Sequence, residues 1–176
     1  MDSSRLSKYT VFEAPDPVVW CPRGYAILVT DPRGTWNSEG DATFQTPVEG
    51  ADEYDLIEWT AKQAWCNGKI GLGGVSYLVQ SQWMVAQMRP PSLKAIIAWE
   101  GWSDAYRDIW FQGGIPETSF APNWVRGIQN GRNETEDVVR IQEEHPLLDE
   151  IWKIREVDLS AIDVPAFIVY RLNKRD

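Results

Sequence analysis

The stretch from Lys69 to Trp83, KIGLGGVSYLVQSQW, constrains the fold more than any other part of the sequence. An apolar segment is followed by a glycine-rich turn and then by residues typical of a helix. Pro90 and Pro91 end that helix, and Ser92–Gly101 is the next apolar run. Because two strands joined through a helix lie parallel with a right-handed crossover, we expect a parallel α/β sheet.

Four further segments extend this pattern. Gly24–Asp31 is a continuous apolar run, which predicts a strand buried on both faces of a parallel sheet, and Ile162–Tyr170 predicts the last strand. Ala51–Cys66 has apolar residues at helical spacing and acidic residues in its first turn, which favour a helix. From 102 to about 158, aromatic and amphipathic helical pieces alternate with Gly, Pro and Asn. This part indicates a helical insertion above the sheet.

A single domain is the expectation for 176 residues. We divide the chain into the N-terminal part of an α/β core (1–101), a helical cap insertion (102–160), and a final core strand with a short tail (161–176). Such a sheet has about four strands, and exposed apolar strand edges can pair with another chain. Self-association through these edges is therefore expected.

Composition disfavours several kinds of partner and site. A formal net charge of −9 argues against nucleic acid and anionic membranes. The sequence has no apolar run of about eighteen residues, and its polar start lacks the apolar stretch of a signal peptide, so we expect a cytoplasmic protein. Cys21 and Cys66 lack metal-ligand spacing and the sequence has one histidine, so we expect free thiols, no metal and no cofactor. GLGGVS lacks the lysine of a phosphate-binding loop and the spacing of a dinucleotide fingerprint.

Ser76 lies where the predicted strand turns into the helix. A nucleophile elbow places a serine in such a turn among small residues, with the following backbone N–H facing the position of an oxyanion. Gly73 and Gly74 are small residues before the serine, and Tyr77 would supply that N–H. Leu78 stands where the pattern G-x-S-x-G has its second glycine. A plain helix N-cap, a favoured role of serine, is therefore the alternative.

Four motifs in the same order, from about Val19 to Tyr170, carry a family resemblance. WCNGKIGLGGVSYL resembles the W(S/C)-x-G-x-(V/I)-G-x-x-G-x-S-Y-L stretch of the cocaine esterase and X-Pro dipeptidyl-peptidase hydrolases, although Val79 replaces the usual Gly or Ala. GYAILVTDPRGTWNSEG, EGWSDAYRD and HPLLDEIWKIRE are similar to further motifs of that family. The resemblance implies a partial α/β-hydrolase fold with a helical cap and no jelly-roll. It also implies acyl transfer from an ester, amide or thioester, with Ser76 as nucleophile and Tyr77 as backbone oxyanion donor.

The same resemblance implies missing parts. Lys174 stands where the family has its triad aspartate, Asp176 comes two residues late, and the triad histidine would follow beyond this sequence. Tyr9 lacks the setting of the family's oxyanion tyrosine. His145, in HP-x-x-D-x-x-W, resembles a structural residue of the cap, with a catalytic role as the alternative. We therefore expect a chain truncated at both ends with weak or no activity, because loss of one oxyanion donor alone costs about 3–4 kcal/mol.

Two other kinds of function stay open. The chain could be a non-catalytic remnant, or a module that binds a small molecule or a partner. Its N-terminal SKYTVFEAPDP is similar to a fungal branch of the family that accompanies secondary-metabolite pathways.

Some remaining polar and aromatic residues have a structural and a functional interpretation. Asp31 and Arg33 are expected to form an ion pair that orders a loop, with a catalytic acid and a substrate clamp as the alternative. Asp104 and Arg107 have the spacing of a helical ion pair, with a role in shaping the acyl pocket at the cap entrance, implied by the resemblance, as the alternative. An aromatic set could form core or line a substrate pocket: Trp99, Trp102, Trp110, Phe111 and Trp124.

Overall fold

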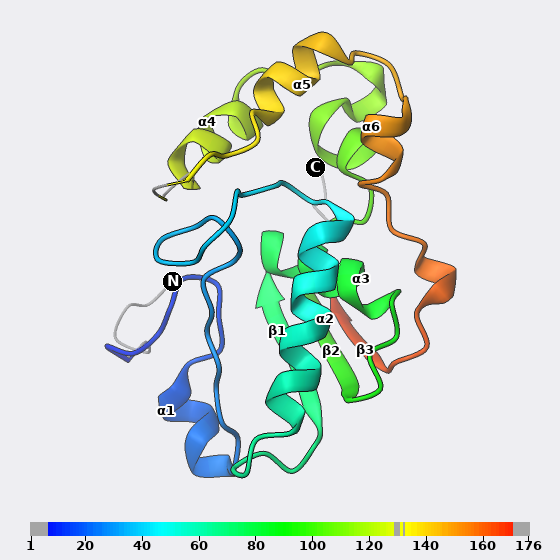
Figure 1. Ribbon diagram of the computed structural model, residues 1–176. Coiled ribbons are helices and arrows are strands. Elements are labelled where there is room, and N and C mark those ends of the chain that lie inside the picture. The colour runs from blue at the N-terminus through cyan, green and yellow to red at the C-terminus, as the bar shows by residue number, and fades with distance from the viewer. Residues whose placement is uncertain (1–6, 129–130, 132, 171–176) are drawn as a thin grey trace, which may run out of the picture.

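Among the residues that the structure describes, three parallel strands form the sheet, in the order β1 (Ile70–Val75), β2 (Leu93–Trp99), β3 (Ala166–Val169). The computed structural model describes residues 7–128, 131 and 133–170. Helices α2 (Pro47–Ala61) and α3 (Tyr77–Ala86) lie on the same face of the sheet (Figure 1). The mostly parallel α/β core predicted from the sequence is confirmed.

The cap lies beyond the carboxyl ends of the strands (Figure 1). Its helices are α4 (Phe120–Ile128), α5 (Val138–Glu144) and α6 (Glu150–Lys153), preceded by a π-helical turn at Tyr106–Trp110 and a 3-10 turn at Gln112–Gly114. A further 3-10 turn, Leu159–Ala161, leads back to β3. The predicted helical insertion is thus present, as a series of short helices.

Helix α2 starts earlier than the apolar pattern predicts. Thr46 is its N-cap residue and Pro47 is its first helical residue, a position that suits proline because its missing N–H has no helical acceptor there. Helix α3 ends at Ala86, shortly before the two prolines, as expected. Prolines therefore locate the ends of these helices better than the spacing of apolar residues does.

The prediction of a strand at Gly24–Asp31 is wrong. A short helix, α1 (Pro17–Trp20), and a 3-10 turn at Cys21–Arg23 precede this run, which is itself irregular and mostly exposed. An apolar run becomes a strand only when a neighbouring strand takes up its backbone hydrogen bonds. In the described residues no strand pairs with it, so the sheet has three strands instead of about four.

The main core lies between the sheet and the two long helices. Ile96 and Ala98 of β2 point into it, where they meet apolar residues of α3 and Ile57 of α2. Ile97 and Trp99 point to the opposite face, which stays exposed in the described part of the chain. β1 and β3 are the edges of this sheet, and self-association through them remains a prediction.

A second core fills the cap. Trp110 and Trp152 are fully buried there, and Phe111 packs edge-on against Trp152 at a ring distance of 5.7 Å. The core interpretation is therefore confirmed for Trp110 and Phe111. These rings hold the short helices together, since helices of four to nine residues are marginal without tertiary packing.

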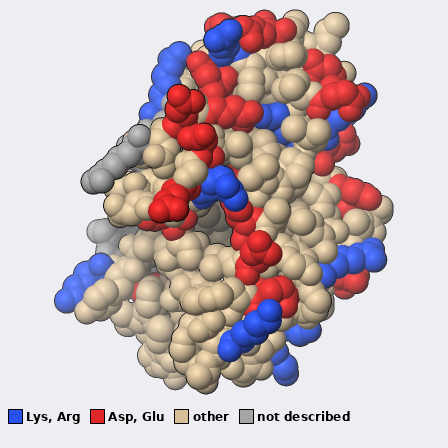
Figure 2. Space-filling view, in the orientation of Figure 1, with Lys and Arg blue, Asp and Glu red and all other residues tan. Residues whose placement is uncertain are grey.

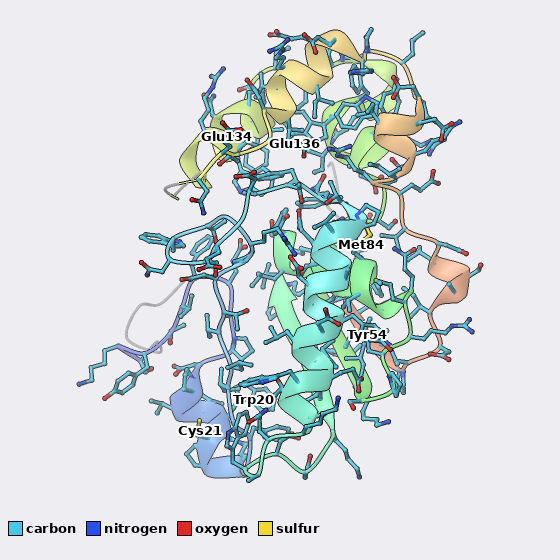
Figure 3. The ribbon with its side chains drawn as sticks, viewed as in Figure 1. Trp20, Cys21, Tyr54, Met84, Glu134 and Glu136 are labelled. Carbon is cyan, nitrogen blue, oxygen red and sulfur yellow. The ribbon has the colours of Figure 1, made fainter. Side chains whose placement is uncertain are left out.

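Arg155 joins the cap to the core. Its guanidinium donates to the backbone oxygen of Phe44 at 3.1 Å and pairs with Glu136, whose other oxygen accepts the Phe44 N–H at 2.9 Å. Figure 3 shows Glu136 at the junction of the two parts, on the segment that leads into α5. Because the Arg155 side chain is almost fully buried, loss of its partner would leave an uncompensated charge.

Two predicted ion pairs have different outcomes. Asp104 and Arg107 are paired, as their spacing predicts. The prediction of an ion pair between Asp31 and Arg33 is wrong, because the Arg33 guanidinium donates instead to Asp52 in α2 at 2.7 Å. This bond ties the loop to the N-terminal part of α2, where a carboxylate is also favoured by the helix dipole.

The surface agrees with the acidic composition. Acidic side chains spread over the cap and its junction with the core on the face shown in Figure 2. Cys21 and Cys66 are free thiols, as predicted. Among the described residues, no helix has both the length and the apolar character needed to cross a membrane.

Adjacent isoleucines on β2 offer a matched test of this packing. Ile96→Ala should lower the free energy of unfolding by about 2–5 kcal/mol, because it leaves a cavity between sheet and helices. Ile97→Ala should cost less than half as much, since Ile97 is 38% exposed and Ile96 only 1%. Urea unfolding of both variants measures the difference, and equal losses would contradict the one-sided sheet.

Candidate active site

Ser76 occupies the turn between β1 and α3 in a backbone conformation that few residues other than glycine adopt. Its φ is 61° and its ψ is −119°. The Ser76 N–H donates to the backbone oxygen of Trp99 at 3.0 Å, and the backbone oxygen of Ser76 accepts the Val79 N–H at 2.9 Å. The hydroxyl makes no capping hydrogen bond to the helix. The positive φ and the missing capping hydrogen bond distinguish this turn from an ordinary serine N-cap, which has extended backbone angles.

Two glycines allow the turn to pack this closely. A methyl group at Gly74 would lie 2.5 Å from Cβ of Leu78. A methyl group at Gly101 would overlap Val79 and lie 3.1 Å from the Ser76 oxygen. Gly73, by contrast, has room for a side chain at ordinary contact distance.

Gly101 was missed in the sequence, although a glycine directly after a strand can mark a close backbone approach. It also explains how the helix accepts Val79 in place of the usual small residue. The valine fills the space that the missing side chain of Gly101 leaves open.

Tyr77 is the first residue of α3. Its backbone N–H has no acceptor inside the helix and lies at the positive end of the helix dipole. The ring packs against Phe44 at 5.5 Å and Trp124 at 5.7 Å between centroids. The hydroxyl donates a hydrogen bond to Oε2 of Glu49. Side chains from three separate segments therefore hold the residue that follows the serine.

Tryptophans border this turn on the cap side. Trp102 and Trp124 are half-buried, lie 6.0 Å apart between ring centroids, and both contact the Tyr77 ring. The indole N–H of Trp102 is buried and has no acceptor among the described residues. A role for these two rings in a substrate pocket remains a prediction, whereas Trp99 lies on the face of the sheet that is exposed in the described part of the chain.

Two carboxyl groups of α2 lie beside Tyr77. Burial raises the pKa of Glu49 to about 7, although the Tyr77 hydroxyl and the Gln45 N–H both donate to it. Burial, followed by repulsion from Glu49, raises the pKa of Glu53 to about 7 as well. Sequence reasoning missed both residues, because two glutamates one turn apart in a helix are usually solvated.

His145 lies in the cap and serves the local structure there. Its Nδ1 is 2.6 Å from Oδ2 of Asp149, and its backbone oxygen accepts the Trp152 indole N–H at 2.7 Å. These contacts support the structural interpretation of this histidine. Among the described residues, no side chain is hydrogen-bonded to the Ser76 hydroxyl.

The other candidates from the sequence lie elsewhere. Tyr9 is 59% exposed in the N-terminal segment. Lys174 and Asp176 lie outside the described residues. Within 7–128, 131 and 133–170, no group of three or more His, Cys, Asp or Glu residues could hold a metal ion.

Known proteins with similar sequences and structures are hydrolases. Cocaine esterase of Rhodococcus sp. (strain MB1 Bresler) is 41% identical over 109 residues, which are 61% of this chain and 19% of that protein. A CocE/NonD family hydrolase of Staphylococcus aureus has a solved structure that is 45% identical, with a TM-score of 0.87 over 91% of this chain and 29% of that chain. An α-amino acid ester hydrolase, 20% identical with a TM-score of 0.65, shares the fold.

This chain therefore spans less than a third of the length of these similar proteins. The part that it spans includes the strand, the serine turn and the helix described above. The family described as X-Pro dipeptidyl-peptidase (S15 family) matches residues 3–138, which is more than half of the chain. The chain belongs to the X-Pro dipeptidyl-peptidase S15 family.

Proposed function

We propose that the chain carries the nucleophile of a serine hydrolase, with Ser76 accepting the acyl group of an ester, amide or thioester. The observation that carries this proposal is the backbone of Ser76, at φ 61° and ψ −119° directly before a helix. Such a conformation is costly, and it persists only where the surrounding structure enforces it. Here it directs the hydroxyl away from a capping role.

The chemistry is acyl transfer. The hydroxyl oxygen of Ser76, Oγ, attacks the substrate carbonyl carbon. The carbonyl oxygen becomes an oxyanion, and the Tyr77 backbone N–H donates a hydrogen bond to it. The intermediate then expels the alcohol, amine or thiol and leaves an acyl-serine, which water hydrolyses. Since no described side chain is hydrogen-bonded to the Ser76 hydroxyl, water takes the serine proton during attack and supplies a proton to the departing alcohol, amine or thiol.

Without a base the reaction is slow. Removal of triad members costs on the order of 10⁴–10⁶ in rate, while the oxyanion hole and substrate binding still give about 10³–10⁴ over water. We therefore propose weak turnover for the chain by itself. A role in a fungal secondary-metabolite pathway remains a prediction from the N-terminal motif.

The two tryptophans support an apolar acyl group. Trp102 and Trp124 lie next to Tyr77 beside the turn, and Trp102 meets both other rings edge-on, while Trp124 is tilted against Tyr77. Aromatic faces of this kind bury apolar groups and orient them. A small-molecule substrate with an apolar or aromatic acyl part is the expected class.

Intact mass after treatment with a fluorophosphonate tests the nucleophile. The folded chain should form one adduct slowly, because the turn presents Ser76 beside an oxyanion donor even without a base. Ser76→Ala and the urea-unfolded chain should form none in the same time. Equal labelling of the folded and unfolded chains would contradict the proposal.

Gly101→Ala tests whether the close approach of helix and strand sets the reactivity. The added methyl group overlaps Val79, so it should displace the turn and slow Ser76 labelling by about 10- to 100-fold. Adding Val79→Gly to this variant should restore part of the rate.

Gly127→Ala is the matched control. Gly127 lies in α4, where a methyl group would meet no described atom within 4 Å outside its neighbours and its own helix backbone, and alanine suits a helix better than glycine. This variant should label like the original chain. Equal rates for the Gly101 and Gly127 variants would show that the packing of the turn is not what limits the serine.

A further inference from the structure

We propose that Glu49 is a positioning residue for the Ser76 turn, because its carboxylate holds the side chain of Tyr77, the residue that follows the nucleophile. The proposal rests on the proposed function of Ser76 and adds a residue to it. Glu49 lies in the first turn of α2, 28 residues before Tyr77. The contact therefore joins the starts of the two helices that cover the sheet.

Both oxygens of Glu49 have a donor from a different segment. Oε2 accepts the Tyr77 hydroxyl, and Oε1 accepts the Gln45 N–H at 2.7 Å. The carboxylate also lies at the N-terminus of its own helix, where the dipole favours a negative charge. Glu49 is thus fixed in place and can in turn fix the tyrosine.

The Tyr77 ring cannot turn independently of the helix start. Phe44 packs against it edge-on, and Trp124 contacts it as well. With the hydroxyl held by Glu49, the ring has fixed contacts along its length and at its tip. Because the same residue carries the backbone N–H beside Ser76, this anchoring sets where that N–H points.

A buried carboxylate at Glu49 costs more free energy than a purely structural contact with the Tyr77 ring requires. Glu53 faces it from the next turn of α2 and Glu136 from the segment before α5, where Arg155 pairs with Glu136. Burial, and to a smaller extent repulsion from Glu136, raise the pKa of Glu49 to about 7. An apolar contact with the ring would avoid both costs. The hydrogen bond from the Tyr77 hydroxyl accounts for a carboxylate at this position.

The anchoring should depend on pH. Above pH 7 the ionised Glu49 accepts a charge-assisted hydrogen bond from Tyr77, which is stronger than the bond to a neutral carboxyl below pH 7. Stability changes in the opposite direction. Glu49 and Glu53 have pKa values raised from 4.5 to about 7 in the folded state, so their contribution to stability is present below about pH 4.5 and is lost as the pH rises to 7.

The test compares Ser76 labelling by a fluorophosphonate in the original chain and in Glu49→Gln, which imitates the neutral carboxyl. The two rates should agree at about pH 5.5 and differ by roughly tenfold at about pH 8.5, the change expected for a hydrogen bond to a charged group. Glu49→Ala and Tyr77→Phe should be slow at both values. The double variant should lose no more than either single variant, because both remove the same contact.

Glu53→Gln is the control, since this carboxyl is close to Glu49 but makes no hydrogen bond to Tyr77. It should label like the original chain at about pH 8.5. If Glu49→Gln also labels like the original chain at every pH, the proposal is overturned.

A second measurement separates this inference from the proposed function. The amide NMR signal of Tyr77 should shift with pH around a midpoint near 7 in the original chain and in Glu53→Gln. The shift should be much smaller in Glu49→Gln, where only Glu53, which makes no hydrogen bond to Tyr77, still titrates. If the original chain forms no Ser76 adduct, the proposed function fails and this shift alone decides the inference. A Tyr77 signal that does not respond to pH near 7 would overturn it.

Discussion

The close approach of helix α3 to the end of strand β2 is the constraint on which the site depends. Gly101 brings the two backbones together, so that the Ser76 N–H reaches the Trp99 oxygen and Val79 fits against the glycine. Any side chain at position 101 would separate them. The conformation of Ser76 thus follows from the packing of the start of α3 against the residues at the end of β2.

Holding this turn has costs that other parts of the chain offset. Ser76 has a rare backbone conformation, and two carboxyl groups with pKa values near 7 lie beside Tyr77. The apolar layer between α2, α3 and the sheet supplies the stability that these features reduce. Arg155 and Glu136 then keep the cap, with Trp124, over the turn.

Sequence reasoning succeeds where the information is local. The strand, turn and helix around Ser76 follow from apolar runs, glycines and prolines within about thirty residues, and the structure has them. Reasoning fails where distant partners decide. Gly24–Asp31 has the composition of a strand but no neighbouring strand in the described residues, and Arg33 pairs with Asp52 in place of nearby Asp31. The bond from Tyr77 to Glu49 links positions that no pattern connects.

The most direct test of this account is a crystal structure of the chain at a resolution that fixes the backbone of Ser76. We expect a φ near 61°, with the Ser76 N–H bonded to the Trp99 backbone oxygen and the Tyr77 hydroxyl bonded to Glu49. A Ser76 with negative φ, whose hydroxyl accepts an N–H from the first turn of α3, would contradict it. The serine would then be a helix cap, and Gly101 would have no part in presenting it.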